Sequence, residues 1–194
     1  MRIVGGKWRG RRLDAPEGRD VTRPTTDRTR EQMASMVLSA FGLDLSEVSV
    51  LDAFAGSGAI GFELLSRGAR SCTFVDADRK ALARIRANAR ELGATTREYA
   101  VVTGDVFKLV ARGALAHAPF SLVVLDPPYA LPAQQVSDLV QALRDSGQLD
   151  EHAYVLYERA AKAPGLELVN SAMLKSKAHG TTAVDLIVLG ETDD

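Results

Sequence analysis

Short apolar runs alternate with amphipathic segments along most of the chain. Runs rich in Val, Leu and Phe, each too short for an ordinary helix, predict buried strands over residues 48–51, 71–75, 99–103, 120–125 and 154–158. The intervening segments carry apolar residues at helical spacing and predict helices that end near residue 66 and that cover 79–92, 106–115 and 134–144. Strands that alternate with helices in this way favour a parallel sheet with helices on both faces.

Two segments at the carboxyl-terminal end depart from this alternation. Residues 166–174 and 183–189 resemble strands, and Gly180 with its neighbours suits a turn rather than a helix. They predict an antiparallel hairpin at one edge of an otherwise parallel sheet.

The amino-terminal end also departs from it. Residues 2–4 and 7–9 flank two glycines and predict a short β-hairpin. A helix is expected to begin at Thr26, because an apolar stripe at helical spacing follows it. We therefore expect a hairpin arm and loop over residues 1–25 and a single α/β domain over 26–194.

Composition narrows the class of protein. The chain has 194 residues, of which 46% are hydrophobic, and no apolar stretch reaches membrane-spanning length. Cys72, the only cysteine, excludes an internal disulfide, and we expect it to pack in the core. These features and the absence of a signal-like start predict a soluble, cytoplasmic protein. Nothing in the sequence demands an oligomer, so we expect a monomer.

Charge is distributed unevenly. Residues 1–30 hold nine Lys or Arg and four Asp or Glu, a local balance of +5 in a chain whose net charge is −1. A basic segment on an acidic body is typical of a polyanion-binding extension, although a solvated surface would have the same pattern. The candidate RNA-binding residues in this segment are Arg2, Lys7, Arg9, Arg11, Arg12, Arg23, Thr25, Arg28 and Arg30.

A glycine loop follows the strand at residues 48–51. Gly56, Gly58 and Gly61 satisfy the spacing G-x-G-x-x-G, and Asp76 follows Gly56 by twenty residues, as in a dinucleotide site. Asp52 disfavours that interpretation, because a carboxylate beside a pyrophosphate would be repulsive. S-adenosylmethionine carries an ammonium and a sulfonium, which Asp52 would attract, and its carboxylate could use the loop amides.

Other acids at the predicted sheet edge extend the candidate site. Asp76 could accept from ribose hydroxyls, and Asp105 from an adenine amine that Val106 covers. Asp76 with Asp78, and Asp105, could equally cap the helices that follow them. The candidate cofactor residues are Asp52, Phe54, Gly56, Ser57, Gly58, Asp76, Asp105 and Val106.

The sequence Asp126-Pro127-Pro128-Tyr129 ends the apolar run at 120–125. Two prolines cannot continue a sheet ladder, so the strand is expected to stop here, at the edge where open α/β sheets bind ligands. Asp126 and a backbone carbonyl could accept the hydrogens of a planar amine, and Tyr129 could stack on its ring. A plain Pro-Pro turn with a capping acid is the alternative. We expect Asp126, Pro127, Pro128 and Tyr129 to be the catalytic set.

Together these strings resemble a known family. Residues 52–58 and the Asp-Pro-Pro-Tyr sequence resemble class I S-adenosylmethionine-dependent methyltransferases of base amines, which have a Rossmann-like sheet. Residues 2–10 and 23–31 are similar to the RsmD family, and residues 177–182 resemble its Lys-x-Tyr-Gly-x-Thr, with His179 at the tyrosine position.

The resemblance implies methylation of guanine N2 in 16S ribosomal RNA, with the RNA or an assembling small subunit as partner. Two other functions stay open: methylation of a DNA, other RNA (adenine N6) or protein amine, and a non-enzymatic NAD-binding module. The three histidines lack metal-ligand spacing, so no metal is expected.

Overall fold

A computed structural model describes residues 1–15, 26–113 and 115–190 of the chain. Its helices and strands, in chain order, are α1 (Asp27–Ala40), β1 (Ser49–Asp52), α2 (Ala59–Ser66), β2 (Ser71–Asp76), α3 (Arg79–Leu92), β3 (Tyr99–Thr103), α4 (Val106–Val110), β4 (Phe120–Leu125), α5 (Ala133–Asp145), β5 (Leu149–Ala160), β6 (Ser171–His179) and β7 (Thr182–Leu189).

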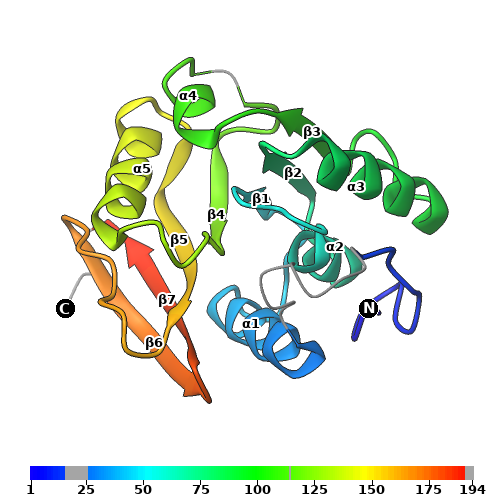
Figure 1. The fold of residues 1–194 in the computed structure, drawn as a ribbon, viewed down its shortest axis with the longest axis horizontal. Coiled ribbons are helices and arrows are strands. Elements are labelled where there is room, and N and C mark those ends of the chain that lie inside the picture. Colours follow the sequence, from blue (N-terminus) through cyan, green and yellow to red (C-terminus); the bar gives the residue numbers. More distant parts are fainter. Residues whose placement is uncertain (16–25, 114, 191–194) are drawn as a thin grey trace.

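The strands form one twisted sheet in the order β3-β2-β1-β4-β5-β7-β6 (Figure 1). The five strands from β3 to β5 pair in parallel. β7 is antiparallel to β5, and β6 is antiparallel to β7. This is a mostly parallel Rossmann-like sheet with an antiparallel hairpin at its carboxyl-terminal edge, which confirms the predicted fold class.

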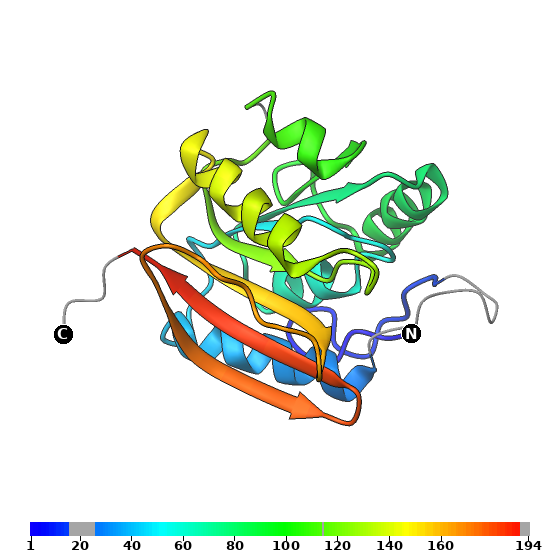
Figure 2. The ribbon, with the colours of Figure 1, turned by 60° about the vertical axis from the view of Figure 1, so that its left-hand side comes forward.

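Helices cover both faces of this sheet. One core joins α1, α2 and α3 to residues such as Val50, Phe74 and Val124, and the other joins α4 and α5 to residues such as Leu51 and Val123. The alternation of neighbouring strand residues between the two cores is the period-two pattern of a sheet buried on both sides. In Figure 2, α5 and α1 lie on opposite sides of the sheet, and α1 lies against the β6–β7 hairpin.

Local sequence signals locate most helix and strand boundaries. Thr26 caps α1 by accepting a hydrogen bond from the Thr29 amide, and Gly93 ends α3 in the left-handed conformation. α3 and β4 have the residue limits that the pattern predicts. Helical spacing, a capping side chain and a terminal glycine all agree at α3, which explains why this helix is predicted well.

Tertiary packing shifts other boundaries. α4 ends at Val110 rather than 115, and a turn through Gly113, whose φ is +66°, follows it. β6 begins at Ser171 rather than 166. The preceding leucines, Leu166 and Leu168, pack against the α4–α5 core instead of pairing in the sheet. Apolar residues therefore mark burial in this segment, but not strand pairing.

The amino-terminal pairing differs from the predicted hairpin. Arg2 pairs with Arg12 in an antiparallel bridge, and the expected pairing of residues 2–4 with 7–9 does not occur. The reason lies in α2, where the buried carboxylate of Glu63 accepts both the Val4 and the Gly5 amides, at 2.8 and 2.9 Å. The two glycines therefore serve the docking of a loop against α2 and not a two-residue hairpin turn.

Apolar side chains hold this amino-terminal segment in place. Ile3, Trp8 and Leu13 are buried in the core under α1, α2 and α3, and the Trp8 ring meets Phe62 edge-on at 6.5 Å between centroids. At Gly6, whose φ is +77°, a side chain would collide with the carbonyl of Ser66. Three buried side chains thus anchor residues 1–13 to the core of the domain, and residues 16–25 of the expected loop lie outside the described residues.

Candidate active site

A cleft of about 1140 Å³ opens at the carboxyl edge of the parallel strands. β1 and β4 are neighbours there, while the helices that follow them, α2 and α5, cover opposite faces of the sheet. Open α/β sheets bind ligands at such a switch point. The cleft brings together most of the predicted cofactor and catalytic residues, namely Asp52, Phe54, Gly56, Ser57, Asp76, Asp105, Val106, Asp126, Pro127, Pro128 and Tyr129.

The glycine loop is tied to the end of β2. Gly56 and Gly58 have φ values of +51° and +75°, a region that side chains disfavour. The Gly56 amide donates to Oδ2 of Asp76 at 2.8 Å, and Oδ1 of Asp76 accepts from the Asp78 amide. Gly58 is the N-cap of α2 and lies beside the cleft-lining residues rather than among them. Asp76 therefore fixes the loop over the cleft.

Gly61 sets the distance between α2 and the sheet. A side chain at this position would lie 2.3 Å from the Phe74 ring and 2.7 Å from Sγ of Cys72, both on β2. The third glycine of the G-x-G-x-x-G spacing thus allows close packing of helix on strand. Cys72 is fully buried, as predicted, and burial raises the pKa of its thiol well above the usual value.

Asp52 is a buried acid at the end of β1. Its side chain accepts a hydrogen bond from the Gly61 amide at 3.3 Å, and it is 3% exposed. Burial, reinforced by the negative charges of Asp126 and Asp76, raises the pKa of Asp52 to about 7. A cation bound in the cleft would favour the ionised form of Asp52, whereas a phosphate would not.

The acids near the ends of β2 and β3 cap helices, line the cleft, or do both. Asp78 caps α3 by accepting from the Lys80 amide at 2.8 Å, whereas Asp76 faces the glycine loop. Asp105 caps α4 through one oxygen, which accepts from the Phe107 amide, and it also lines the cleft. A carboxylate has two oxygens, so helix capping and ligand binding are compatible at Asp105.

The Asp-Pro-Pro-Tyr segment forms another wall of the cleft. Asp126 is half-buried and Pro127 is buried, whereas Tyr129 is 59% exposed. The Tyr129 hydroxyl lies 3.5 Å from Oγ1 of Thr182 at the start of β7. An exposed ring at the rim of a cleft is a surface on which a base can stack.

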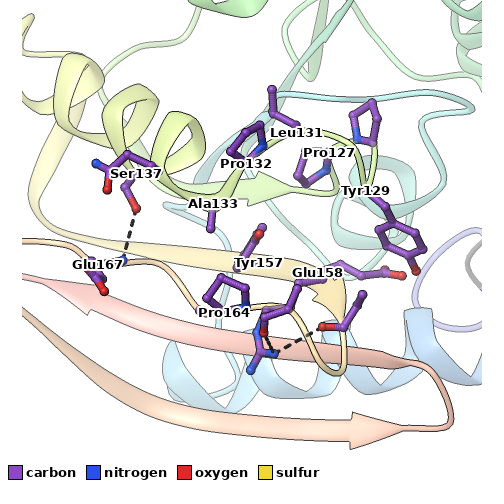
Figure 3. Close-up of a pocket in the computed structure, with 16 residues that line it drawn as sticks. Pro127, Tyr129, Leu131, Pro132, Ala133, Ser137, Tyr157, Glu158, Pro164 and Glu167 are labelled. Carbon is purple, nitrogen blue, oxygen red and sulfur yellow. Dashed lines mark hydrogen bonds between the residues drawn. The ribbon is translucent and has the colours of Figure 1, made fainter.

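A second cavity, of about 420 Å³, adjoins the cleft (Figure 3). Pro127, Pro128, Tyr129 and Glu158 line both spaces. Glu158 is absent from the sequence-based site. The signal that could have found it is its position as the last residue of the predicted strand over 154–158, because β1 ends in an acid and an acid follows β4 directly.

Some basic side chains of the amino-terminal segment pair with groups of the protein, and others are exposed on its surface. Arg2 pairs with Asp27 at 3.1 Å, and Lys7 pairs with Glu98. Arg11 donates to the backbone carbonyl of Glu91 at 2.7 Å. Arg9 and Arg12 are exposed on the same segment.

Two predicted RNA contacts near α1 differ sharply. Arg30 is 1% exposed, and its guanidinium donates to Asp27 and to the Arg2 carbonyl, so it stabilises the junction with α1 from inside. Arg28 is exposed and lines a groove with Lys175 and Lys177 of β6. Arg23 and Thr25, also predicted RNA contacts, lie outside the described residues.

Neither a metal cluster nor a membrane-spanning helix is present in the part of the chain that the structure describes. Among residues 1–15, 26–113 and 115–190, no group of three His, Cys, Asp or Glu side chains is arranged to hold a metal ion. In the same ranges no helix is both long and apolar enough to cross a membrane.

Comparison with known proteins places this geometry in a family. A family model described as Conserved hypothetical protein 95 matches residues 1–188. Ribosomal RNA small subunit methyltransferase D from Escherichia coli strain K12 is 32% identical over 198 residues, which cover 100% of this chain and 93% of that protein. The protein of the same name from Haemophilus influenzae is 28% identical over 187 residues, which cover 96% of this chain and 92% of that protein.

A solved structure supports the same assignment. An Escherichia coli structure described as a candidate methyltransferase has a TM-score of 0.79 and 28% identity, and the match covers 99% of both chains. The chain therefore belongs to the RsmD family of ribosomal RNA methyltransferases, which have the class I fold and depend on S-adenosylmethionine.

Proposed function

We propose that this protein transfers a methyl group from S-adenosylmethionine to the N2 amine of a guanine in small-subunit (16S) ribosomal RNA. The observation that carries the proposal is that the glycine loop and the Asp126–Tyr129 segment line one and the same cleft, at the sheet's switch point. A cofactor on the loop and an amine at Asp126 would meet in that space. The full-length similarity to small-subunit methyltransferases supports the choice of RNA.

The cofactor side of the cleft suits a molecule with positive charge and no phosphate. S-adenosylmethionine supplies a methyl group on a positively charged sulfur. Asp76, positioned by the Gly56 amide, would accept from the ribose hydroxyls, and Asp105 would accept from the adenine amine beside Val106. Asp52 would stabilise the nearby positive charge in its ionised form.

The substrate side would hold the amine without deprotonating it first. An exocyclic amine is a weak nucleophile because its lone pair is delocalised into the ring. Asp126 and the Pro127 carbonyl would accept hydrogen bonds from its two N–H groups and direct the nitrogen lone pair toward the methyl group. The N–C bond would form as the C–S bond breaks, and the methylated nitrogen would then release one proton to water. Such positioning can contribute several kcal/mol, about 7–11 at the extreme. A paired base must turn out of its helix to reach this cleft, and Tyr129 would then stack on it.

The RNA chain would lie on exposed cations around the cleft. Arg9 and Arg12 lie on the docked amino-terminal segment, and Arg28 faces Lys175 and Lys177 across the groove between α1 and β6. These five side chains are exposed and can neutralise phosphates, a contribution that falls as salt concentration rises. We include Arg23 and Thr25 in the same proposal because they precede α1 directly, and we leave Arg30 out because it is buried.

The Asp-Pro-Pro-Tyr segment could also hold the amine of a DNA base, of another RNA base or of a protein. A methylation assay on each substrate distinguishes these possibilities. Purified protein would be incubated with labelled S-adenosylmethionine and, in parallel, naked small-subunit RNA, assembled small subunits, duplex DNA and protein. Label in N2-methylguanosine supports the proposal, whereas label only in N6-methyladenine or in protein would overturn it.

The role of Asp126 has its own test. Asp126→Ala should reduce methyl transfer to background while cofactor affinity stays within a few-fold of the original value. Full activity in this variant would refute the assigned amine contact. Asp150→Ala, an exposed acid on β5 outside the cleft, is the matched control and should leave both quantities unchanged.

A further inference from the structure

We propose that Glu158 selects guanine by accepting the N1–H of the base while Asp126 accepts from the neighbouring N2 amine. This inference rests on the proposed guanine-N2 activity and adds the residue that would discriminate among bases.

The sheet register places the two acids side by side. Val124 of β4 pairs with Leu156 of β5, and Leu125 pairs with Tyr157. Asp126 and Glu158 directly follow the last residues of this register, and both line the cleft. Adjacent strands are about 4.8 Å apart, so flexible side chains that leave neighbouring strands on the same face can bring their oxygens together on one edge of a base.

Both acids also belong to the same side of the sheet. Side chains alternate between the faces, so Asp126 follows Val124 and Glu158 follows Leu156. Val124 and Leu156 both lie in the core beneath α1, α2 and α3. Asp126 and Glu158 each lie two residues beyond this core, and both line the cleft.

Glu158 is buried yet directed at the substrate side. It is 6% exposed, and it lines both the cleft and the adjoining cavity. In Figure 3 its side chain extends from β5 toward the ring of Tyr129. A glutamate is rarely buried to this extent without a structural or binding role.

Two other buried carboxylates show what a structural role looks like here. Glu63 is bound by Arg67 at 2.8 Å, and Asp185 is bound by Arg159 at 2.6 Å. Neither lines the cleft. Glu158 differs because it lies beside the proposed amine site. A carboxylate offers about four acceptor positions, so contacts of Glu158 within the protein are compatible with one to a base.

Guanine matches a pair of adjacent acceptors. Its Watson–Crick edge presents the N1–H and the N2 amine next to each other, and both are donors. Adenine and cytosine instead place a ring nitrogen acceptor beside their amine, and that lone pair would face the Glu158 carboxylate. A site built to bond a donor rejects an analogue without it by large factors, on the order of 10⁴ in favourable cases.

The test uses RNA with 2-aminopurine at the target position. This base keeps the N2 amine but has an acceptor at N1. The measured quantity is the ratio of kcat/KM for guanine to that for 2-aminopurine, so differences in intrinsic amine reactivity cancel between variants. The wild-type ratio should be at least about 100-fold, and Glu158→Gln should lower it at least 10-fold, because a glutamine can donate to N1 of 2-aminopurine.

Controls keep the result interpretable. Glu151→Gln, on the exposed start of β5, should retain the wild-type ratio. Glu158→Asp keeps the charge but withdraws it by one methylene, and it should lower the ratio even if Glu158→Gln fails to fold. An unchanged ratio in a folded, cofactor-binding variant would overturn the inference. Absence of N2-methylguanosine with wild-type protein would instead overturn the proposed activity.

Discussion

Asp52 should affect folding stability and the proposed cofactor binding in opposite ways as the pH changes. An unfolded aspartate has a pKa of about 3.9, whereas burial and the charges of Asp126 and Asp76 raise the folded value to about 7. The folded state therefore holds the proton more tightly. Stability should fall as the pH rises from about 4 to about 7 and then level off, by an amount on the order of 4 kcal/mol.

Asp52→Asn should remove much of this fall. Its neutral amide would make the variant more stable than the wild type at pH 8, while its affinity for S-adenosylmethionine drops because the positive charge loses its partner. Denaturant unfolding at pH 5 and pH 8, with calorimetric titration of the cofactor at pH 8, measures both. Asp150→Asn, an exposed acid, serves as control. A variant that lost stability at pH 8 would contradict this account of Asp52.

Tyr129 should contribute through its ring rather than its hydroxyl. The side chain is 59% exposed at the rim of the cleft, and its hydroxyl is 3.5 Å from Thr182. Tyr129→Ala should lower kcat/KM for RNA by about 10- to 100-fold, since base stacking is worth about 1–3 kcal/mol. Cofactor affinity should not change. Steady-state kinetics would refute the stacking role if Tyr129→Phe were as impaired as Tyr129→Ala.

Some residues of the candidate site could be assigned from the sequence, and others could not. Asp52 and Asp126 follow apolar runs directly, so their place at the carboxyl edge follows from local pattern and the general rule for α/β sheets. Glu158 also ends a predicted strand, but this position alone does not show that it lies near Asp126. Its importance depends on β5 being the neighbour of β4, and strand order is not visible in local pattern.

The amino-terminal segment also depends on contacts that local sequence pattern does not reveal. Its two glycines are typical of a hairpin turn, but its partners are Glu63 and Ser66, about sixty residues away in the sequence. α3, in contrast, carries its cap, its apolar stripe and its terminal glycine within its own sequence. Elements whose limits depend on local signals are predictable, and elements defined by long-range bonds are not.

Docking of this segment should affect stability and RNA binding through different residues. Trp8 is 8% exposed and packs on Phe62, so Trp8→Ala should cost about 3–5 kcal/mol of unfolding free energy. Arg12 is exposed, so Arg12→Ala should change stability by less than about 0.5 kcal/mol but weaken RNA binding. Denaturant unfolding and filter binding separate the two effects. An equal loss of stability in both variants would show that Arg12 is structural.

The molecule as a unit separates its charges. Acids outnumber bases in the cleft lining, where six acids accompany Lys80 and Arg84. Bases outnumber acids in the groove between α1 and β6, where Arg28, Lys175 and Lys177 accompany Glu31. This division suits an enzyme that draws a positively charged cofactor into the cleft and holds a polyanion around it. The net charge of −1 conceals this division. The uneven charge of residues 1–30 predicted a basic segment, but it did not predict that Lys175 and Lys177 of β6 lie beside Arg28.

Salt dependence tests the groove as an RNA surface. Replacing Arg28, Lys175 and Lys177 together with glutamine should reduce the slope of log affinity against log salt by about 2, since each phosphate contact contributes about 0.7–0.9. The slope is measured from binding of small-subunit RNA between about 50 and 200 mM salt, where such effects are large. Lys162→Gln, an exposed lysine outside the groove, is a control. An unchanged slope in the triple variant would remove the groove from the interface.

The most direct test of the central claim is mass-spectrometric mapping of methylated nucleosides in small-subunit RNA from cells that lack this protein. The account predicts that one N2-methylguanosine disappears, returns with the wild-type chain and stays absent with Asp126→Ala. If every N2-methylguanosine of that RNA persisted without the protein, or if Asp126→Ala restored the missing one, the proposed reaction at this cleft would be contradicted.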